Sequence, residues 1–261
     1  MIKFFRKIRQ NLLSEGKTGK YIKYAIGEII LVVIGILIAL QLNNWNESRK
    51  TKLLEIEIYK EIKDDITVSL LDLERGRSQH DRRIVTNSKI RDHIINERPF
   101  NDTIAIYLID ADSDDQFFPK TSGFEALKSA GLETLSNDTL RQKVADLFQL
   151  SYIRIMGMGR DKAPIRNFQF LQPYQKYLKL DKNNKGYRNY AENDSVLYYK
   201  PIIKNYELFM KDDQLVKDLQ EAIFLRIFKL GNYTDVLDRS NELLFEIDEE
   251  LKRLENKNQM K

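Results

Sequence analysis

One apolar segment near the N-terminus constrains this chain more than any other feature of its sequence. Residues 25–42 read AIGEIILVVIGILIALQL, and no charged or amide side chain interrupts the stretch from Ile29 to Leu40. Eighteen helical residues at about 1.5 Å each cover about 27 Å, close to the roughly 30 Å hydrocarbon core of a bilayer. No other segment is comparably apolar. We therefore expect residues 25–44 to be a transmembrane helix rather than a buried helix of a soluble domain.

The flanks of this segment favour an uncleaved signal anchor over a cleaved signal peptide. Tyr21, Tyr24 and Trp45 lie at its two ends, where amphipathic aromatic rings prefer to sit, and we expect them to be interfacial anchors. The basic region before the segment is 24 residues long, and the residues after it are bulky and polar. A cleavage site needs small residues at that place.

Charge is distributed unevenly along the chain and predicts the orientation of this helix. Residues 1–24 carry seven Lys or Arg and one Glu, although the net charge of the whole chain is only +4. The 20 residues before the segment hold six Lys or Arg, and the 20 after it hold four. Because cytoplasmic flanks are the more basic ones, we expect residues 1–24 in the cytoplasm and residues 45–261 outside it. The remainder of the chain is slightly acidic, which argues against a nucleic-acid partner.

The first 13 residues have the pattern of a short interfacial helix. Their large apolar side chains fall on one stripe, and their basic side chains lie off it. Such a segment is expected to rest on anionic lipid headgroups, and a disordered basic tail is the alternative.

Three residues of the apolar segment share one helical face. At about 100° per residue, Gly35 and Ala39 each fall within about 20° of Glu28. Gly35 and Ala39 also form a small-xxx-small pair, which lets two helices approach closely. One interpretation is a helix–helix contact with Glu28 at its edge. The alternative is a glutamate that reaches the cytoplasmic headgroups, with Gly35 and Ala39 as ordinary residues of the span.

The N-terminal sequence resembles a family of uncharacterised single-pass membrane proteins of Gram-negative bacteria. The resemblance is carried by residues 1–9 (MIKFFRKIR) and 24–47 (YAIGEIILVVIGILIALQLNNWNE), and more weakly by 123–131 (GFEALKSAG) and 136–140 (SNDTL). It implies an inner-membrane location, with a cytoplasmic N-terminus and a helical periplasmic domain. It implies no catalytic residue, because the family has no known function.

The rest of the chain reads as long helices. Leu54, Ile58, Ile62, Ile66, Leu70 and Leu73 form an apolar stripe that fades after Gly76. From about Asp212 a second helix carries a seam at alternating spacings of three and four: Val216, Leu219, Ile223, Arg226, Leu230, Tyr233, Leu237, Ser240, Leu244, Ile247, Leu251 and Leu254. We expect the two helices to pack as an antiparallel pair. A homodimer seam is the alternative.

The region between these helices is expected to be helical as well. Residues 104–109 read as a short helix between loops, Thr121 and Ser122 as a helix start, and Gly131 as a helix stop. Residues 181–195 read as a polar connection. The predicted fold is all-α: a single N-terminal transmembrane helix followed by an elongated helical bundle with long antiparallel helices.

Little in the composition points to catalysis. The chain has no Cys and two His, which excludes disulfides and thiolate chemistry, and we expect no metal and no cofactor. Two stretches echo a calcium loop, 110–121 and 181–192. The first lacks the Gly and Glu that such a loop needs, and the second places Lys185 at a ligand position. A solvated acidic loop and a turn are the preferred interpretations.

Three function classes remain, and the sequence favours the first. This is a structural or interaction protein of the envelope whose partners are the lipid bilayer, a second copy or other envelope proteins. The second is a binding module that captures a ligand or polymer in an aromatic-lined groove near residues 168–177 and 198–206. The third, an envelope enzyme, has no visible site.

Overall fold

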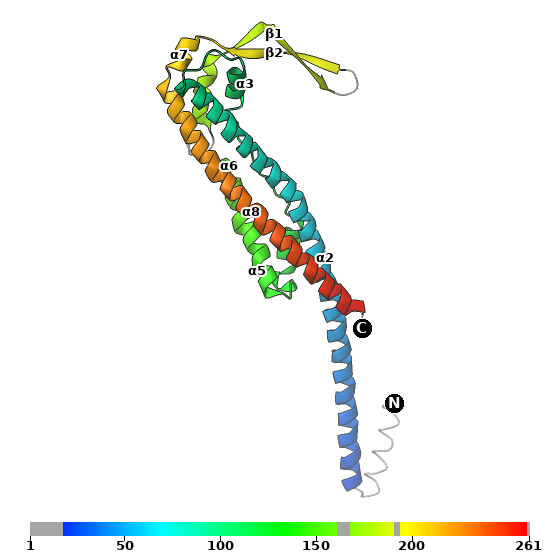
Figure 1. Ribbon diagram of the computed structural model, residues 1–261. Helices are drawn as coiled ribbons and strands as arrows, with labels where there is room; N and C mark the ends of the chain where they lie inside the picture. Colours follow the sequence, from blue (N-terminus) through cyan, green and yellow to red (C-terminus); the bar gives the residue numbers. More distant parts are fainter. Residues whose placement is uncertain (1–17, 161–167, 191–193, 260–261) are drawn as a thin grey trace. The chain divides into compact units, whose positions relative to one another are not determined.

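The structure, a computed structural model, describes residues 18–160, 168–190 and 194–259 (Figure 1). The predicted interfacial helix within residues 1–13 lies outside them. The chain divides into two compact units, Met1–Glu55 and Ile56–Lys261. The helical elements are α2 (Thr18–Ile95), α3 (Thr103–Ile109), α4 (Ser122–Ala130), η1 (Leu132–Thr134), α5 (Asp138–Asp146), η2 (Leu147–Ser151), α6 (Tyr152–Arg160), η4 (Gln169–Tyr177), α7 (Tyr206–Met210) and α8 (Asp213–Gln259). The strands are β1 (Leu178–Tyr190) and β2 (Asp194–Ile203).

The first unit consists, in its described part, of α2 up to Glu55. Its large apolar side chains are exposed throughout, as Leu31 (63%) and Leu42 (61%) illustrate. The helix is long and apolar enough to cross a membrane, and its most apolar 18 residues have a mean hydropathy of 2.6 with none of them buried. The long apolar N-terminal helix predicted from the sequence is therefore present.

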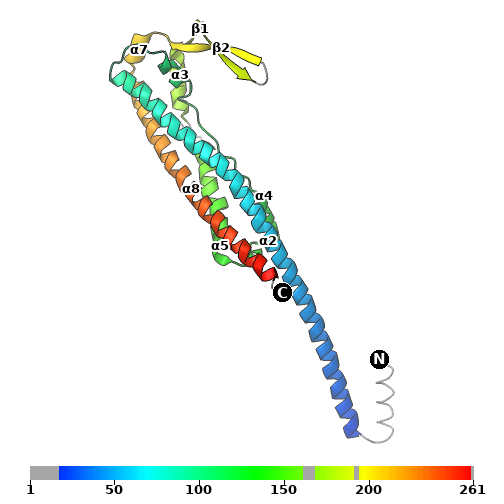
Figure 2. The same cartoon turned by 45° about the vertical axis from the view of Figure 1, so that its right-hand side comes forward.

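In the second unit, α2 from Ile56 onward and α8 run side by side in opposite directions (Figures 1 and 2). Lys60 pairs with Glu255 at 2.7 Å, and Lys63 pairs with Asp248 at 2.6 Å. Much further along α2, Arg91 donates a hydrogen bond to Gln220 at 2.6 Å. The predicted antiparallel pair is thus formed within one chain. Residues of the predicted α8 seam are buried, including Leu219, Ser240 and Ile247, each at 0% exposure.

The structure adds two details to the expected long helices. The apolar stripe of α2 fades after Gly76, yet the helix continues to Ile95, and its polar residues His80 and Asn87 are fully buried. Gly231, which could have interrupted the second helix, lies inside an unbroken α8. Tertiary packing outweighs the low helix propensity of these residues. His80 and Asn87 are buried in the packed unit, and Gly231 lies within the continuous hydrogen-bond ladder of α8.

The core of the second unit is divided in two. One hydrophobic cluster contains residues of α2 between Ile56 and Leu73, of α4 to α6, and of α8 between Tyr233 and Leu254. The other contains Ile90 and Ile94 of α2, together with residues of α3, η4, β2, α7 and the first turns of α8. Between the two clusters, α2 and α8 place polar and charged side chains on their facing sides.

A carboxylate of α2 caps the helix α4. Asp65, fully buried, accepts hydrogen bonds from the backbone N–H of Gly123 (2.7 Å) and Phe124 (3.3 Å) and from the Ser122 hydroxyl (2.7 Å). The helix begins where Thr121 and Ser122 predict, but Thr121 makes no side-chain cap. A Cβ on Gly123 would lie 2.5 Å from the backbone carbon of Glu61, so only glycine allows this close approach.

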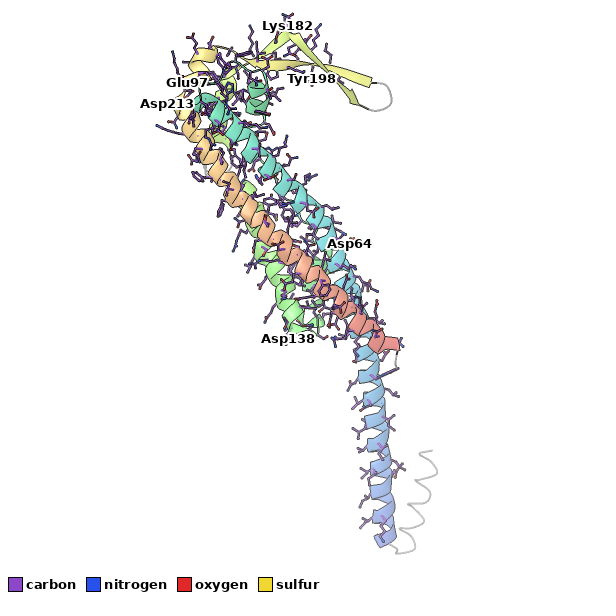
Figure 3. The ribbon with its side chains drawn as sticks, in the orientation of Figure 1. Asp64, Glu97, Asp138, Lys182, Tyr198 and Asp213 are labelled. Carbon is purple, nitrogen blue, oxygen red and sulfur yellow. The ribbon has the colours of Figure 1, made fainter. Side chains whose placement is uncertain are left out.

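The expectation of an all-α fold is wrong in one region. Strands β1 and β2 form an antiparallel hairpin where the sequence predicted a polar connection at 181–195 (Figure 3). The register shifts between Leu180 and Lys185, so the Asn-Asn-Lys sequence that reads as a turn lies at an irregularity inside β1. The described remainder of the unit is mostly helical.

A cross-strand pair stabilises this hairpin. Gly186 lies opposite Tyr198, and the Tyr198 ring lies so close that a Cβ on Gly186 would be 2.4 Å from it. Glycine therefore lets the aromatic ring cover the strand backbone. The four consecutive side chains from Val196 to Tyr199 alternate between the faces of β2, yet all are exposed.

Candidate functional site

The residues predicted to mediate a helix contact in the membrane lie on α2. Because α2 is helical from Thr18 to Ile95, Glu28, Gly35 and Ala39 share one face as expected. Ala39 is exposed, and a Cβ added at Gly35 would meet nothing within 4 Å. The face therefore has room for a second helix, and the contact itself stays a prediction.

The three predicted interfacial anchors also belong to α2. Trp45 is 59% exposed, which leaves its ring available to a membrane interface. The side chains of Tyr21 and Tyr24 lie outside the part that the structure describes.

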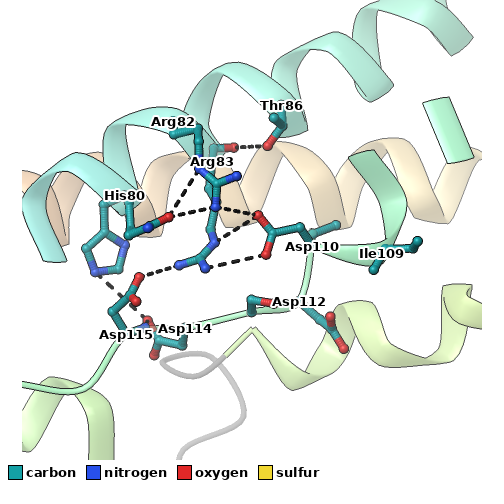
Figure 4. Close-up of polar contacts among 12 residues, drawn as sticks. His80, Arg82, Arg83, Thr86, Ile109, Asp110, Asp112, Asp114 and Asp115 are labelled. Carbon is teal, nitrogen blue, oxygen red and sulfur yellow. Dashed lines mark hydrogen bonds and ion pairs between the residues drawn. The ribbon is translucent and has the colours of Figure 1, made fainter. Parts of the chain in front are cut away.

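Buried polar and charged side chains of the second unit meet between its two hydrophobic clusters. Figure 4 shows those that come from α2 and from the loop after α3. We call this group the charged centre and define it by the residues His80 and Arg83 of α2, Asp110, Asp114 and Asp115 of the loop after α3, and Arg226 and Lys229 of α8. His80 and Arg226 are fully buried, Lys229 is 3% exposed and Arg83 is 6% exposed. Charged groups this deep are costly unless they are paired or hydrogen-bonded.

Ion pairs join the loop to both long helices. Arg83 faces two carboxylates, since its Nε lies 3.4 Å from Asp110 and its Nη1 contacts Asp115. Lys229 approaches Asp114 from α8, with 2.5 Å between Nζ and Oδ2. The loop is therefore held between α2 and α8, which corrects the expectation of a solvated acidic loop. Asp112 turns away from this cluster, towards the amide of Gln175 at 3.5 Å (Figure 4).

Arg226 belongs to the predicted α8 seam, and it is fully buried although its side chain is charged. Its Nη2 donates hydrogen bonds to the backbone carbonyls of Ala111 and Ser113, each at 2.9 Å. Its guanidinium carbon lies 3.7 Å from the centre of the Phe168 ring, a cation–π contact. Burial, with Arg83 nearby, lowers the pKa of Arg226 to about 10. Its Nε and Nη1 have no hydrogen-bond partner among the residues that the structure describes.

His80 is neutral in this environment. Its ring packs edge-on against Tyr233, with centroids 5.3 Å apart, and its Nε2 lies 3.9 Å from Asp114. Burial lowers its pKa to about 3, and the positive charges of Lys229, Arg226 and Arg83 act in the same direction. A histidine held neutral over the whole physiological range does not switch charge with pH in the folded protein.

The His80 pKa predicts a loss of stability in weak acid. The unfolded chain binds a proton near pH 6.5 and the folded chain does not, so the stabilisation present above pH 6.5 is lost as the pH falls towards 3. Between pH 7.5 and 5.5 we expect this residue to remove about 1.4 kcal/mol. Urea unfolding of the full-length protein in detergent at both pH values would measure the loss.

The variant His80→Gln is the control for that experiment. It removes the titrating group, so most of the stability difference between pH 7.5 and 5.5 should disappear. The variant His93→Gln keeps His80 and should therefore retain most of that difference. An unchanged pH dependence in His80→Gln would show that other groups cause it.

The aromatic residues that were expected to line a groove lie in two segments, 168–177 and 198–206. Of the first aromatic group, Phe168, Tyr174 and Tyr177 are buried in the second hydrophobic cluster, so they do not line a groove. The stretch 181–192, which echoed a calcium loop, begins inside β1. In the described part of the chain, no three His, Cys, Asp or Glu side chains are grouped so that they could hold a metal ion.

A comparison with known protein families matches residues 28–164 to a family of unknown function, DUF6090. The match covers just over half of the chain. The chain belongs to the DUF6090 family. Searches of curated proteins and of solved structures give no match. The resemblance to an uncharacterised family is confirmed at this level, and the Gram-negative envelope location stays a prediction.

The DUF6090 match contains only part of the charged centre. It begins at Glu28 and includes His80, Arg83, the acidic loop and the contact between Asp65 and Gly123, whereas the β1–β2 hairpin and α8 lie outside it. Sequence reasoning had placed Arg226 on the α8 seam and had singled out the acidic loop. It missed that the two meet, because the loop and α8 are more than 100 residues apart.

Proposed function

We propose that this DUF6090 protein is anchored in the inner membrane by residues 25–44 and acts as a structural or interaction protein of the envelope. The observation that carries the proposal is the 18-residue stretch of mean hydropathy 2.6 of which no residue is buried. Eighteen such residues exposed to water would be strongly unfavourable, and a bilayer removes that cost. Trp45 at the end of this stretch suits a membrane interface.

The proposed orientation has a cytoplasmic N-terminus and a periplasmic domain of residues 45–261. It rests on the six Lys or Arg before the segment against four after it. The absence of Cys is compatible with an oxidising compartment.

Two measurements test the anchor and its direction. The full-length protein should stay in the membrane pellet after alkaline carbonate washing, and an alkaline phosphatase fused to its C-terminus should be active in cells. Release by carbonate would contradict the anchor. An inactive phosphatase together with an active cytoplasmic reporter at the same position would reverse the orientation.

The proposed role is interaction rather than catalysis, and the charged centre supports it. Arg83 and Lys229 hold the acidic loop by ion pairs, and Arg226 holds it by hydrogen bonds to backbone carbonyls. Each of these side chains connects the acidic loop to one of the two long helices. Such an arrangement stabilises a scaffold, because the charged side chains are used for contacts between segments of the same unit.

We further propose that α2 associates with another helix in the membrane through Gly35 and Ala39, most simply in a second copy. The double variant Gly35→Leu/Ala39→Leu should weaken self-association at least several-fold in a membrane reporter assay, because two bulky side chains would separate the helices. The control Val33→Phe/Leu37→Phe adds bulk to the opposite face and should have little effect. Equal signals from both variants would refute the contact.

A further inference from the structure

A second polar feature of unit Ile56–Lys261 lies where α2 ends, away from the charged centre. A cavity of about 440 Å³ opens between the last turn of α2, the following turn and α3. Its lining includes the nitrogen-bearing side chains of Lys89, His93 and Arg98 and the largely apolar side chains of Phe100, Ile104 and Tyr107. No carboxylate belongs to the described lining. The volume falls in the range of sites for small organic molecules.

The backbone explains why Lys89, His93 and Arg98 converge. Lys89 and His93 are four residues apart and so lie on one face of α2. The helix then ends in a Schellman motif, in which Arg98 N–H bonds to the His93 carbonyl and Glu97 N–H bonds to the Ile94 carbonyl. Glu97 takes the left-handed conformation, with φ 45°, that this motif requires. The reversal returns Arg98 to the face that carries Lys89.

A hydrogen-bond chain through Tyr206 connects two residues of the cavity lining. The Tyr206 hydroxyl donates to the Arg98 carbonyl at 2.9 Å and lies 2.5 Å from His93 Nε2. Because the hydroxyl has a single proton, His93 must donate from Nε2, which places an N–H at that ring position. Tyr206 also packs edge-on against Phe100, with centroids 5.3 Å apart. The chain therefore holds the histidine, the Arg98 backbone and the aromatic wall together.

The positive charge of this cavity is not neutralised by its own walls. Lys89 lies 5.2 Å from the centre of the Tyr107 ring and 3.4 Å from its hydroxyl. Neither Lys89 nor Arg98 forms an ion pair with any residue in the part of the chain that the structure describes. Elsewhere in this unit, cations such as Lys63 and Lys229 face carboxylates. A cavity with two such cations and an aromatic wall is complementary to an anion that has an apolar part.

We propose that this cavity binds a small organic carboxylate, with its carboxylate between Lys89 and Arg98 and its apolar part against Phe100 and Ile104. Benzoate is a suitable probe because it combines a planar ring with one carboxylate. Acetate has the charge without the ring, and benzamide has the ring without the charge.

The experiment uses the full-length protein in detergent and follows two signals. Calorimetry measures affinity, and the ring protons of His93 report binding at this place in an NMR spectrum. The assignment is simple because the chain contains only two histidines. We expect benzoate to shift the His93 signal saturably, and to bind at least about tenfold more tightly than either acetate or benzamide.

Variants of the cavity residues distinguish benzoate binding in the cavity from unspecific binding elsewhere. Lys89→Gln and Arg98→Gln should each weaken benzoate binding by about tenfold or more, because each removes a charge-assisted hydrogen bond. The matched controls Lys211→Gln and Arg77→Gln change exposed cations outside the cavity and should leave the affinity unchanged. The proposal is overturned if benzoate does not bind, if benzamide binds equally well, or if the control variants lose as much affinity as the cavity variants.

Discussion

Replacing Asp65 by alanine should lower the stability of the second unit by about 3 kcal/mol. Asp65 is fully buried and accepts hydrogen bonds from Ser122, Gly123 and Phe124. Its loss would remove the N-terminal cap of α4 and leave two buried backbone N–H groups without an acceptor. For a unit of this size we expect a melting temperature about 6 to 12 °C lower, measured on the full-length protein in detergent.

The neighbouring carboxylate provides the control for this variant. Asp64 pairs with Lys120 at the surface, and its side chain is 62% exposed. An exposed pair contributes little, so Asp64→Ala should change the melting temperature by no more than about 2 °C. Equal effects of the two alanine variants would show that the cap does not stabilise α4.

Replacing Lys229 by methionine should be comparably destabilising, by about 3 kcal/mol. Lys229 and Asp114 are both largely buried and lie 2.5 Å apart, so the variant leaves a carboxylate without its cation. The same substitution at Lys217, an exposed residue of α8, should have an effect below about 0.5 kcal/mol. Urea unfolding of the two variants makes the comparison.

The double variant Lys229→Met/Asp114→Leu distinguishes a lost ion pair from lost packing. Removing both charges abolishes the unpaired carboxylate, so we expect the double variant to be more stable than Lys229→Met alone. A double variant whose loss equals the sum of the single losses would show that Lys229 and Asp114 do not interact energetically.

Sequence reasoning was most successful where a pattern repeats over many turns. The seam from Val216 to Leu254 predicted the face of α8 that is buried, and the apolar stripe before Gly76 predicted its counterpart on α2. Both predictions rest on periodicity, which a long helix expresses directly. The same reasoning stopped the α2 stripe too early, because the first buried residues after Gly76, which are His80, Arg83 and Asn87, are polar.

The hairpin and the charged centre depend on contacts that local sequence does not contain. The strand residues 196–199 are apolar without alternation, and the Asn-Asn-Lys-Gly sequence reads more strongly as a turn. The charged centre needs the acidic loop, His80 and Arg226 at one point, and only the tertiary fold brings them there. The sequence contains no local pattern that indicates that these residues lie together.

The division of the second unit into two hydrophobic clusters affects how a disturbance spreads through it. Side chains that prefer water separate the clusters, so direct apolar contact does not connect one with the other. The clusters are connected through the backbones of α2 and α8 and through polar side chains such as His80, whose ring lies near Phe168 of one cluster and Tyr233 of the other. We therefore expect the end that carries the cavity and the hairpin to open partly independently of the other end.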